Sequence, residues 1–151
     1  MIVFENFSFQ YNSQAEPTLK NINLTIHQGE KILIVGPSGS GKSTFAHCIN
    51  GLIPNQYAGT ITGSAQIAGK NLQDTSLFDL SFVTGTVLQD TDGQFIGLTV
   101  AEDIAFVLEN DAVAQAEMQK KVAQWSEIVD VQVQLDKRPQ DLSGGQKQRV
   151  S

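Results

Sequence analysis

Gly36-Pro37-Ser38-Gly39-Ser40-Gly41-Lys42-Ser43 is the stretch that decides the fold, because it matches the pattern G-x-x-x-x-G-K-[ST] of a phosphate-binding loop. Residues 31–35 before it are mostly apolar and predict a central strand covered on both faces. Residues 42–50 after it carry apolar side chains at helical spacing, and Gly51 provides a stop. A buried strand, a tight turn and a helix are the context that this motif requires, so the sequence predicts a nucleotide site here.

Each residue type in this loop has a physical role in holding phosphate. Glycines allow the backbone to wrap closely around an anion with successive N–H groups pointing inward, and the start of the helix adds about half a positive charge. Lys42 is expected to reach the β- and γ-phosphates of ATP, and the Ser43 hydroxyl is expected to bind Mg²⁺. The alternative is a glycine-rich turn that precedes a helix by chance. The candidate ATP-binding residues of the loop are Gly36, Pro37, Ser38, Gly39, Ser40, Gly41, Lys42, Ser43 and Thr44.

Length and composition limit the function further. The chain has 151 residues, enough for the core of one domain, and carries 10 basic against 16 acidic residues. We therefore expect no nucleic-acid partner, because no basic field is present to hold one. Cys48 is the single cysteine, which excludes an internal disulfide. No apolar run approaches the roughly 18 residues of a membrane span, and the N-terminus does not resemble an export signal. Any membrane role is expected to pass through a partner.

The first half of the chain predicts an α/β lobe that includes an antiparallel β layer. Apolar and polar side chains alternate over residues 7–11 and again over residues 22–26, as in half-buried strands. Residues 65–67 predict another short strand. Residues 83–88 predict a second buried strand that ends at Gln89.

The second half predicts helices. Thr99 and Glu102 have the spacing of a capping box, which starts a helix by satisfying its unpaired amides. A second helix is predicted from about Asp111, with one apolar face that serves packing rather than ligand binding. That face consists of Met118, Val122, Trp125 and Val129. We expect a single domain with a nucleotide-binding lobe over residues 1–89 and a helical lobe over residues 90–151.

Residues 142–146 form a second motif. Ser143 and Gln146 have capping-box spacing, and the glycines between them let an anion approach a helix N-terminus. The spacing alone is equally typical of an ordinary helix cap. The full pentapeptide, however, resembles the signature motif of the ATP-binding cassette (ABC) family, and this resemblance covers the whole chain. The signature residues are Leu142, Ser143, Gly144, Gly145 and Gln146, followed by Lys147, Gln148 and Arg149.

The resemblance implies an α/β P-loop NTPase fold with a helical subdomain, ATPase activity, and ATP and Mg²⁺ as cofactors. It assigns Tyr11 to stacking on adenine and Gln89 to the vicinity of Mg²⁺ and the attacking water, so Lys42 and Gln89 are the candidate catalytic residues and Ser43 and Gln89 the candidate metal ligands. From the residues alone, Tyr11 is equally a packing residue at the end of a strand, and Gln89 a loop amide.

The resemblance also implies partners. ABC ATPases work as head-to-tail dimers, homomeric or heteromeric, in which the signature of one subunit closes over the ATP held by the other. In transporters they bind transmembrane subunits at the cytoplasmic face of the cell membrane. The alternative is a soluble, non-transport ABC ATPase of DNA repair or translation, and the absence of basic stripes disfavours it.

A narrower resemblance is to the ATPases of energy-coupling factor transporters, which import vitamins or metal cations. Gln89-Asp90, Gln94-Phe95 and residues 99–106 carry it, while Thr91 and Val107 depart from the usual pattern. The segment 94–110 would then receive coupling helices of a membrane subunit. Its acidic residues Glu102 and Asp103 are the positions at which charge reversal is expected to uncouple ATPase activity from transport.

The sequence stops at Ser151, inside the helix that the signature begins, and no apolar strand ending in Asp-Glu follows. In the family that it resembles, the aspartate that holds Mg²⁺ and the glutamate that polarises water come later in the chain. We therefore expect a cassette that is incomplete at its C-terminus, binding ATP without hydrolysing it.

Overall fold

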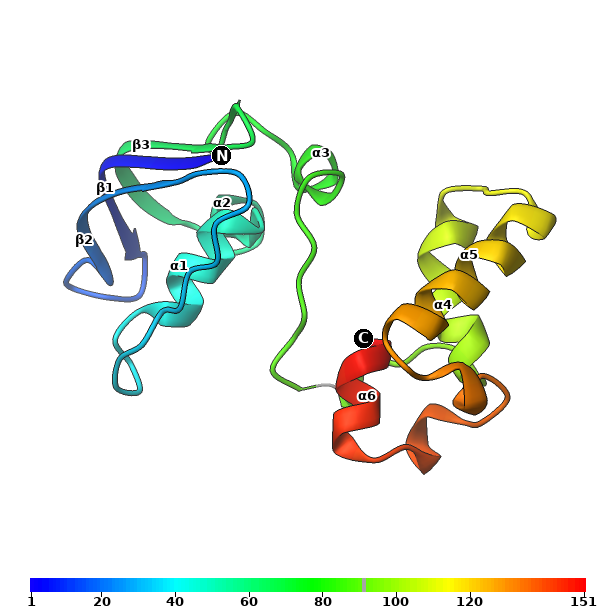
Figure 1. The fold of residues 1–151 in the computed structure, drawn as a ribbon. Coiled ribbons are helices and arrows are strands. Elements are labelled where there is room, and N and C mark those ends of the chain that lie inside the picture. Colours follow the sequence, from blue (N-terminus) through cyan, green and yellow to red (C-terminus); the bar gives the residue numbers. More distant parts are fainter. Residues whose placement is uncertain (91) are drawn as a thin grey trace. The chain divides into compact units, whose positions relative to one another are not determined.

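The computed structural model describes residues 1–90 and 92–151, and it divides into two compact units, 1–86 and 87–151. Thr91, one of the positions at which the sequence departs from the energy-coupling factor pattern, lies outside the described residues. Figure 1 labels the helices and strands of both units.

The first unit is built on a four-stranded antiparallel sheet with strand order β2-β1-β3-β4. The predicted antiparallel layer is confirmed, and the short strand expected at residues 65–67 is the end of a longer one. Alternation of apolar and polar residues places one row of side chains in the core and the other in solvent. The strands are β1 (Ile2–Tyr11), β2 (Leu19–Ile26), β3 (Gly59–Ile67) and β4 (Lys70–Asn71).

An irregularity in β1 brings three phenylalanines to one face. Phe4, Phe7 and Phe9 are all buried, although strict alternation would send Phe4 and Phe7 to opposite faces. The register with β2 shifts between Phe4 and Phe7, and Asn6 has a left-handed backbone with φ 47°. Gly63 on β3, with φ 77°, lies against this bulge. The bulge therefore builds the core on which the first helix packs.

Three helices complete the first unit, namely α1 (Lys42–Ile49), α2 (Leu52–Asn55) and α3 (Leu77–Ser81). The helix predicted after the phosphate-binding loop is α1, and it ends before Gly51 as expected. Its Phe45 ring lies 4.9 Å from that of Phe4, and Cys48 is fully buried. These contacts fix α1 on the β1 side of the core.

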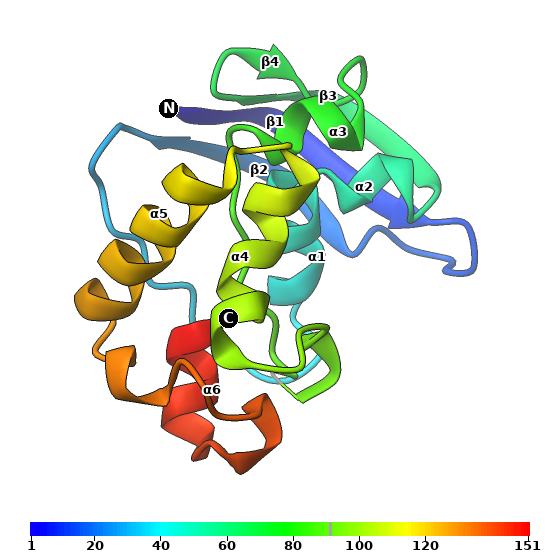
Figure 2. The same cartoon turned by 90° about the vertical axis from the view of Figure 1, so that its right-hand side faces the viewer.

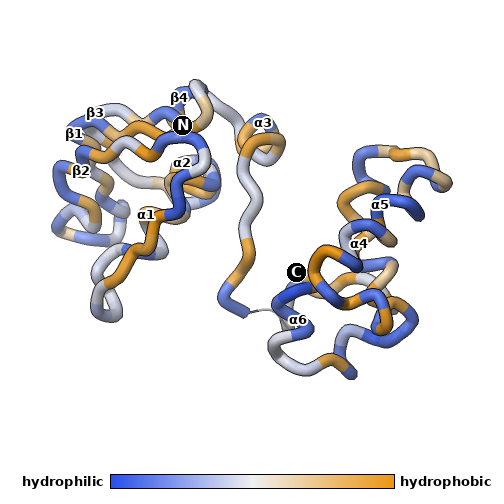
Figure 3. Tube along the Cα trace, viewed as in Figure 1, coloured by the Kyte–Doolittle hydropathy of each residue, from blue (hydrophilic) through white to orange (hydrophobic). Residues whose placement is uncertain are grey.

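Two of the predicted strands are wrong. Residues 31–35 and 83–88 form no strand and pair with none in the described part of the chain. Figure 3 colours residues 32–35 as hydrophobic, yet Leu33 is 85% and Val35 is 78% exposed. An apolar run indicates that side chains on both faces of a segment are to be buried. A strand also needs hydrogen bonds to a neighbouring backbone, and the apolar run does not identify that neighbour.

The second unit is helical. It contains the short 3₁₀ turns η1 (Asp92–Gln94), η2 (Gln132–Gln134) and η3 (Pro139–Asp141) and the helices α4 (Val100–Asn110), α5 (Gln115–Ile128) and α6 (Gly144–Val150). Helices α4 and α5 pack against each other, as Figures 1 and 2 show. Both bonds of the predicted capping box at Thr99 are present, so the start of α4 is confirmed.

Helix α5 departs from the prediction in two respects. It begins at Gln115 rather than near Asp111, because Ala112 is left-handed and the Val113 amide donates to Leu108 O to close α4. The row that faces inward continues from Val122 to Ser126, which is fully buried, while Trp125 is 54% exposed. Trp125 was therefore wrongly placed on the packing face.

The bulge of β1 gives a first prediction. A Cβ atom at Gly63 would lie 2.3 Å from Asn6 O, whereas one at Gly69, where φ is 80°, would meet nothing within 4 Å. Gly69→Ala adds only left-handed strain, about 1 kcal/mol, and Gly63→Ala adds a backbone clash that brings the cost to about 3 kcal/mol. Urea unfolding of the two variants measures the difference. Equal losses of stability would contradict the assigned bulge.

Candidate nucleotide-binding site

The phosphate-binding loop is held against the sheet where it enters α1. Gly41 precedes α1 with φ 91°, and a Cβ atom there would lie 3.2 Å from Thr18 O and 3.1 Å from Leu19 Cδ2. Glycine is therefore required both by the backbone conformation and by the closeness of β2. The first intrahelical bond runs from the Phe45 amide to Gly41 O, so the amides of residues 42–44 belong to the unpaired first turn.

Lys42 folds back across the loop. Its ammonium Nζ donates to Gly36 O at 2.8 Å and to Pro37 O at 2.7 Å. These carbonyls satisfy the cation with neutral acceptors, and phosphate oxygens would replace them by stronger charge-assisted bonds. Ser43 is exposed at the first turn of the helix, where its hydroxyl is accessible to a ligand.

Tyr11 reaches the same turn of α1 from the end of β1. Its hydroxyl lies 3.1 Å from Thr44 Oγ1, and its ring meets Phe9 edge-on with centroids 4.7 Å apart. The structure thus brings Tyr11 next to the loop as a half-buried packing residue. Stacking on adenine stays a prediction for Tyr11, and a contact of nucleotide with Thr44 would use its backbone amide because the side chain is buried.

Two cavities border the loop. One, of about 410 Å³, lies between apolar residues of β2 and the start of the loop, and its lining includes Ile34, Val35 and Lys42. The other, of about 550 Å³, is more polar and lies between residues 14–18 and the tip of the loop at Gly39 and Ser40. Both have the size of small-molecule sites, and only the second combines polar lining with the tip of the glycine-rich turn.

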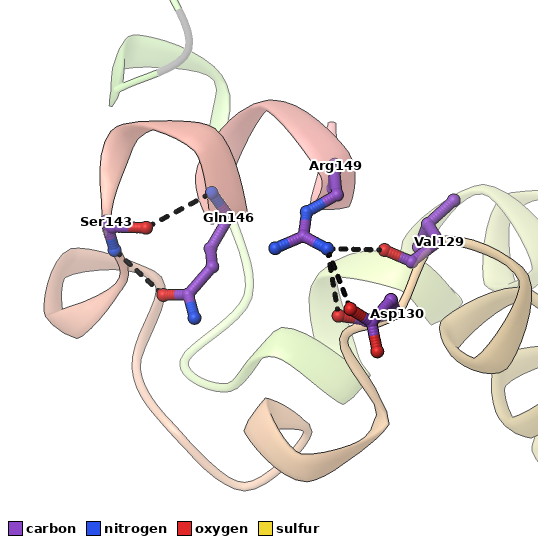
Figure 4. A network of polar contacts seen from close by, with 5 residues as sticks. All are labelled: Val129, Asp130, Ser143, Gln146 and Arg149. Atoms are coloured by element: carbon purple, nitrogen blue, oxygen red, sulfur yellow. Dashed lines mark hydrogen bonds and ion pairs between the residues drawn. The ribbon is translucent and has the colours of Figure 1, made fainter.

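The remaining predicted site residues lie in the second unit. Gln89 is exposed in a bend and ends no strand, so its approach to Mg²⁺ stays a prediction. Ser143 begins α6, where its amide donates to Gln146 Oε1 at 3.0 Å and its Oγ accepts from the Gln146 amide at 3.4 Å (Figure 4). Leu142 is buried, and Gly144 and Gly145 leave open space in front of the first turn. The capping box of the second motif is confirmed.

Two acidic residues hold the turn before α4. Asp103 Oδ1 accepts hydrogen bonds from the amides of Ile96 and Gly97, and Glu102 Oε2 accepts from those of Leu98 and Thr99. Charge reversal at these positions would break the turn before α4 rather than test a docking surface. The capping-box spacing predicted this role for Glu102, and no local pattern predicted it for Asp103.

Residues 1–90 and 92–151 contain neither a candidate membrane-spanning helix nor a cluster of metal-ligating side chains. No helix there is long and apolar enough to cross a membrane. No group of three or more His, Cys, Asp and Glu side chains there could hold a metal ion.

Comparison with known proteins identifies the family. Residues 19–151 match the family model described as ABC transporter. The chain is 76% identical over its full length to a protein of Enterococcus faecalis and 61% identical to one of Lactiplantibacillus plantarum, both named as ABC transporter ATP-binding proteins. It spans 27% of the length of each of these relatives. The chain therefore belongs to the ABC transporter family.

Solved structures agree on the fold. CbiO1 from Clostridium perfringens, described as part of the ABC transporter complex cbiONQ, superposes with a TM-score of 0.87 at 28% identity over 99% of this chain and 58% of that one. MJ0796, an ATP-binding cassette solved as a dimer bound to ADP and Pi, gives a TM-score of 0.79 at 30% identity over 99% of this chain and 66% of that one. The α/β ABC ATPase fold expected from the two motifs is confirmed.

Burial of α1 makes Cys48 a pH-dependent element beside the site. Burial raises the pKa of its thiol to about 12, against an ordinary value of 9.0. The folded state therefore favours the neutral thiol, and this contribution to stability is present below pH 9 and lost as pH rises from 9 toward 12.

We expect the free energy of unfolding to fall between pH 8.5 and 10.5 by about 2 kcal/mol more in the unmodified protein than in Cys48→Ala, which carries no titrating thiol. Urea unfolding at each pH measures this. Native Cys48 should also resist iodoacetamide at pH 8, as mapped by mass spectrometry. Parallel pH profiles, or rapid native alkylation, would contradict the burial of α1.

Proposed function

We propose that this chain is the nucleotide-binding part of an ABC transporter motor, in which ATP binding and hydrolysis drive transport through a membrane partner. The observation that carries the proposal is the loop at the start of α1, where Lys42 and a first turn of unpaired amides converge. A lysine held by neutral carbonyls and a positive helix end both favour a polyphosphate. The family assignment supports the choice of ATP.

Each candidate site residue would contact one part of MgATP, either the phosphates, the metal ion or the adenine base. Lys42 would bind the β- and γ-phosphates and stabilise charge on them during hydrolysis, and the loop amides would bind the remaining oxygens. The exposed Ser43 hydroxyl suits Mg²⁺, a hard cation that takes few protein ligands and keeps phosphate and water oxygens. Gln89 would orient the attacking water, and Tyr11 would contact adenine with its ring.

The partner in ATP binding would be a second cassette. Residues 142–146 of this chain would cover the ATP that the second cassette binds. Closure would then depend on the γ-phosphate, so hydrolysis would reopen the pair. The chain covers 58% of cbiO1 but only 27% of the E. faecalis relative, so that relative is about twice as long as cbiO1. That length leaves room for a second cassette in the same polypeptide, besides pairing with a separate homologous or heterologous subunit.

Transport would require contact with a membrane subunit at the cytoplasmic face of the membrane. Between α4 and α5 lies a groove of about 250 Å³, with Ala105, Met118 and Val122 in its apolar lining and Glu102 and Glu109 at its edge. Cytoplasmic loops of membrane proteins carry an excess of Lys and Arg. We assign the groove to a basic cytoplasmic helix of the transmembrane subunit.

The resemblance to energy-coupling factor ATPases supports import of a vitamin or metal cation as the transported class, and the likeness to cbiO1 is compatible with it. A soluble ABC ATPase of DNA repair or translation is the second candidate. The net charge of −6 and the relatives named as transporter proteins favour transport.

Equilibrium titration of the full-length protein with MgATP tests the nucleotide site. Lys42→Ala removes the charge-assisted bonds to phosphate and should weaken binding by about 100-fold. Tyr11→Ala removes a stacking surface and should weaken it by about tenfold. Phe82→Ala, at an exposed aromatic residue away from Tyr11, serves as the aromatic control. Unchanged affinity in Lys42→Ala with an intact fold would overturn the proposal.

Charge reversal at the groove tests coupling without disturbing the turn before α4. Glu109→Lys should reduce co-purification of the membrane subunit and transport in proteoliposomes by about tenfold, while ATP binding stays unchanged. Glu127→Lys, on an exposed position of α5 outside the groove lining, is the control with the same change of charge. Equal transport by both variants would remove the groove from the coupling surface.

A further inference from the structure

The signature helix α6 is tied to the end of α5 through Arg149. Its Nη1 donates to Val129 O and Asp130 O, each at 3.3 Å, and lies 3.2 Å from Asp130 Oδ2 (Figure 4). These contacts join residues 19 and 20 positions apart in the sequence. One guanidinium nitrogen therefore bridges two helices that the chain connects only through the turns η2 and η3.

The acceptors belong to the negative end of a helix. Helix α5 closes with the amides of Val129 and Val131 donating to Trp125 O and Ser126 O, and Asp130 is left-handed with φ 56°. The carbonyls of Val129 and Asp130 thus follow the last turn and face the guanidinium, where the helix dipole favours a cation. Because the Asp130 carboxylate is 82% exposed, its ion pair adds little, and the carbonyl bonds carry most of the attachment.

Helix α6 needs such an attachment. Its first turn begins with Gly144 and Gly145, which have low helix propensity. Glycines at the start of a helix leave its direction to be set by contacts with neighbouring residues. Leu142 is buried just before the first turn, and Arg149 attaches the following turn to the end of α5.

We propose that Arg149 is a positioning residue for the ATP-covering function of the signature, an inference that rests on the proposed function. By holding α6 on the end of α5, Arg149 sets the direction in which Ser143 and the first-turn amides face the partner cassette's nucleotide. Arg149 itself points to α5 and acts through the helix. Its loss lowers the closure of the cassette pair over ATP and leaves the first binding step, at the phosphate-binding loop, intact.

The test compares binding and turnover in the full-length protein. Arg149→Ala should lower the maximal ATPase rate by about tenfold, while the Kd for MgATP at the open site stays within twofold of the unmodified value. Arg149→Lys can make one of the carbonyl bonds and should recover part of the rate. Arg138→Ala is the matched control, because Arg138 is exposed and pairs with Asp141 only three residues away, bridging no helices. It should turn over within twofold of the unmodified protein.

Each outcome decides one of two claims. Normal turnover in Arg149→Ala, or turnover equally reduced in Arg138→Ala, overturns the positioning role. A parallel loss of ATP binding and thermal stability in Arg149→Ala also overturns it, since a merely structural residue would behave so. Failure of the unmodified protein to bind MgATP instead overturns the proposed function, because that measurement does not involve Arg149.

Discussion

Packing of α1 on the antiparallel sheet is the constraint on which the candidate nucleotide site depends. Phe45 meets Phe4 and Cys48 is buried, so the helix cannot shift without opening the core of the first unit. Gly41 then brings the loop within van der Waals distance of Thr18 and Leu19. The first-turn amides and Lys42 are held on a rigid element, and such support is what a preorganised phosphate site requires.

The helical unit has a comparable chain of attachments around its signature. The first amides of α4 donate to backbone carbonyls of the loop between η2 and η3, Val100 to Lys137 O at 2.9 Å and Ala101 to Leu135 O at 3.0 Å. That loop leads through η3 into α6, and Arg149 returns from α6 to α5. The groove assigned to the membrane subunit and the signature therefore belong to one hydrogen-bonded framework.

The parts of this structure that could be predicted are those set by interactions between residues close in the sequence. Alternation gave β1 and β2, and capping-box spacing gave the starts of α4 and α6, because these signals act within a few residues. The strands predicted at residues 31–35 and 83–88 are absent because a strand must pair with a second backbone, which an apolar run does not identify. The prediction that Trp125 lies on the packing face is wrong because an apolar side chain can fit the helical spacing and still lie at the surface. The buried row continues to Ser126 instead. The Arg149 attachment spans too much sequence for any local signal to reveal it.

Hydrogen–deuterium exchange of the full-length protein, with and without MgATP, tests the central claim most directly. If the loop amides hold the phosphates, peptides covering residues 36–44 should exchange more slowly with MgATP, and this protection should vanish in Lys42→Ala. Peptides that cover α5 should show unchanged exchange and serve as an internal reference. Unchanged exchange in residues 36–44 at saturating MgATP would contradict the account, because the nucleotide would then be bound elsewhere.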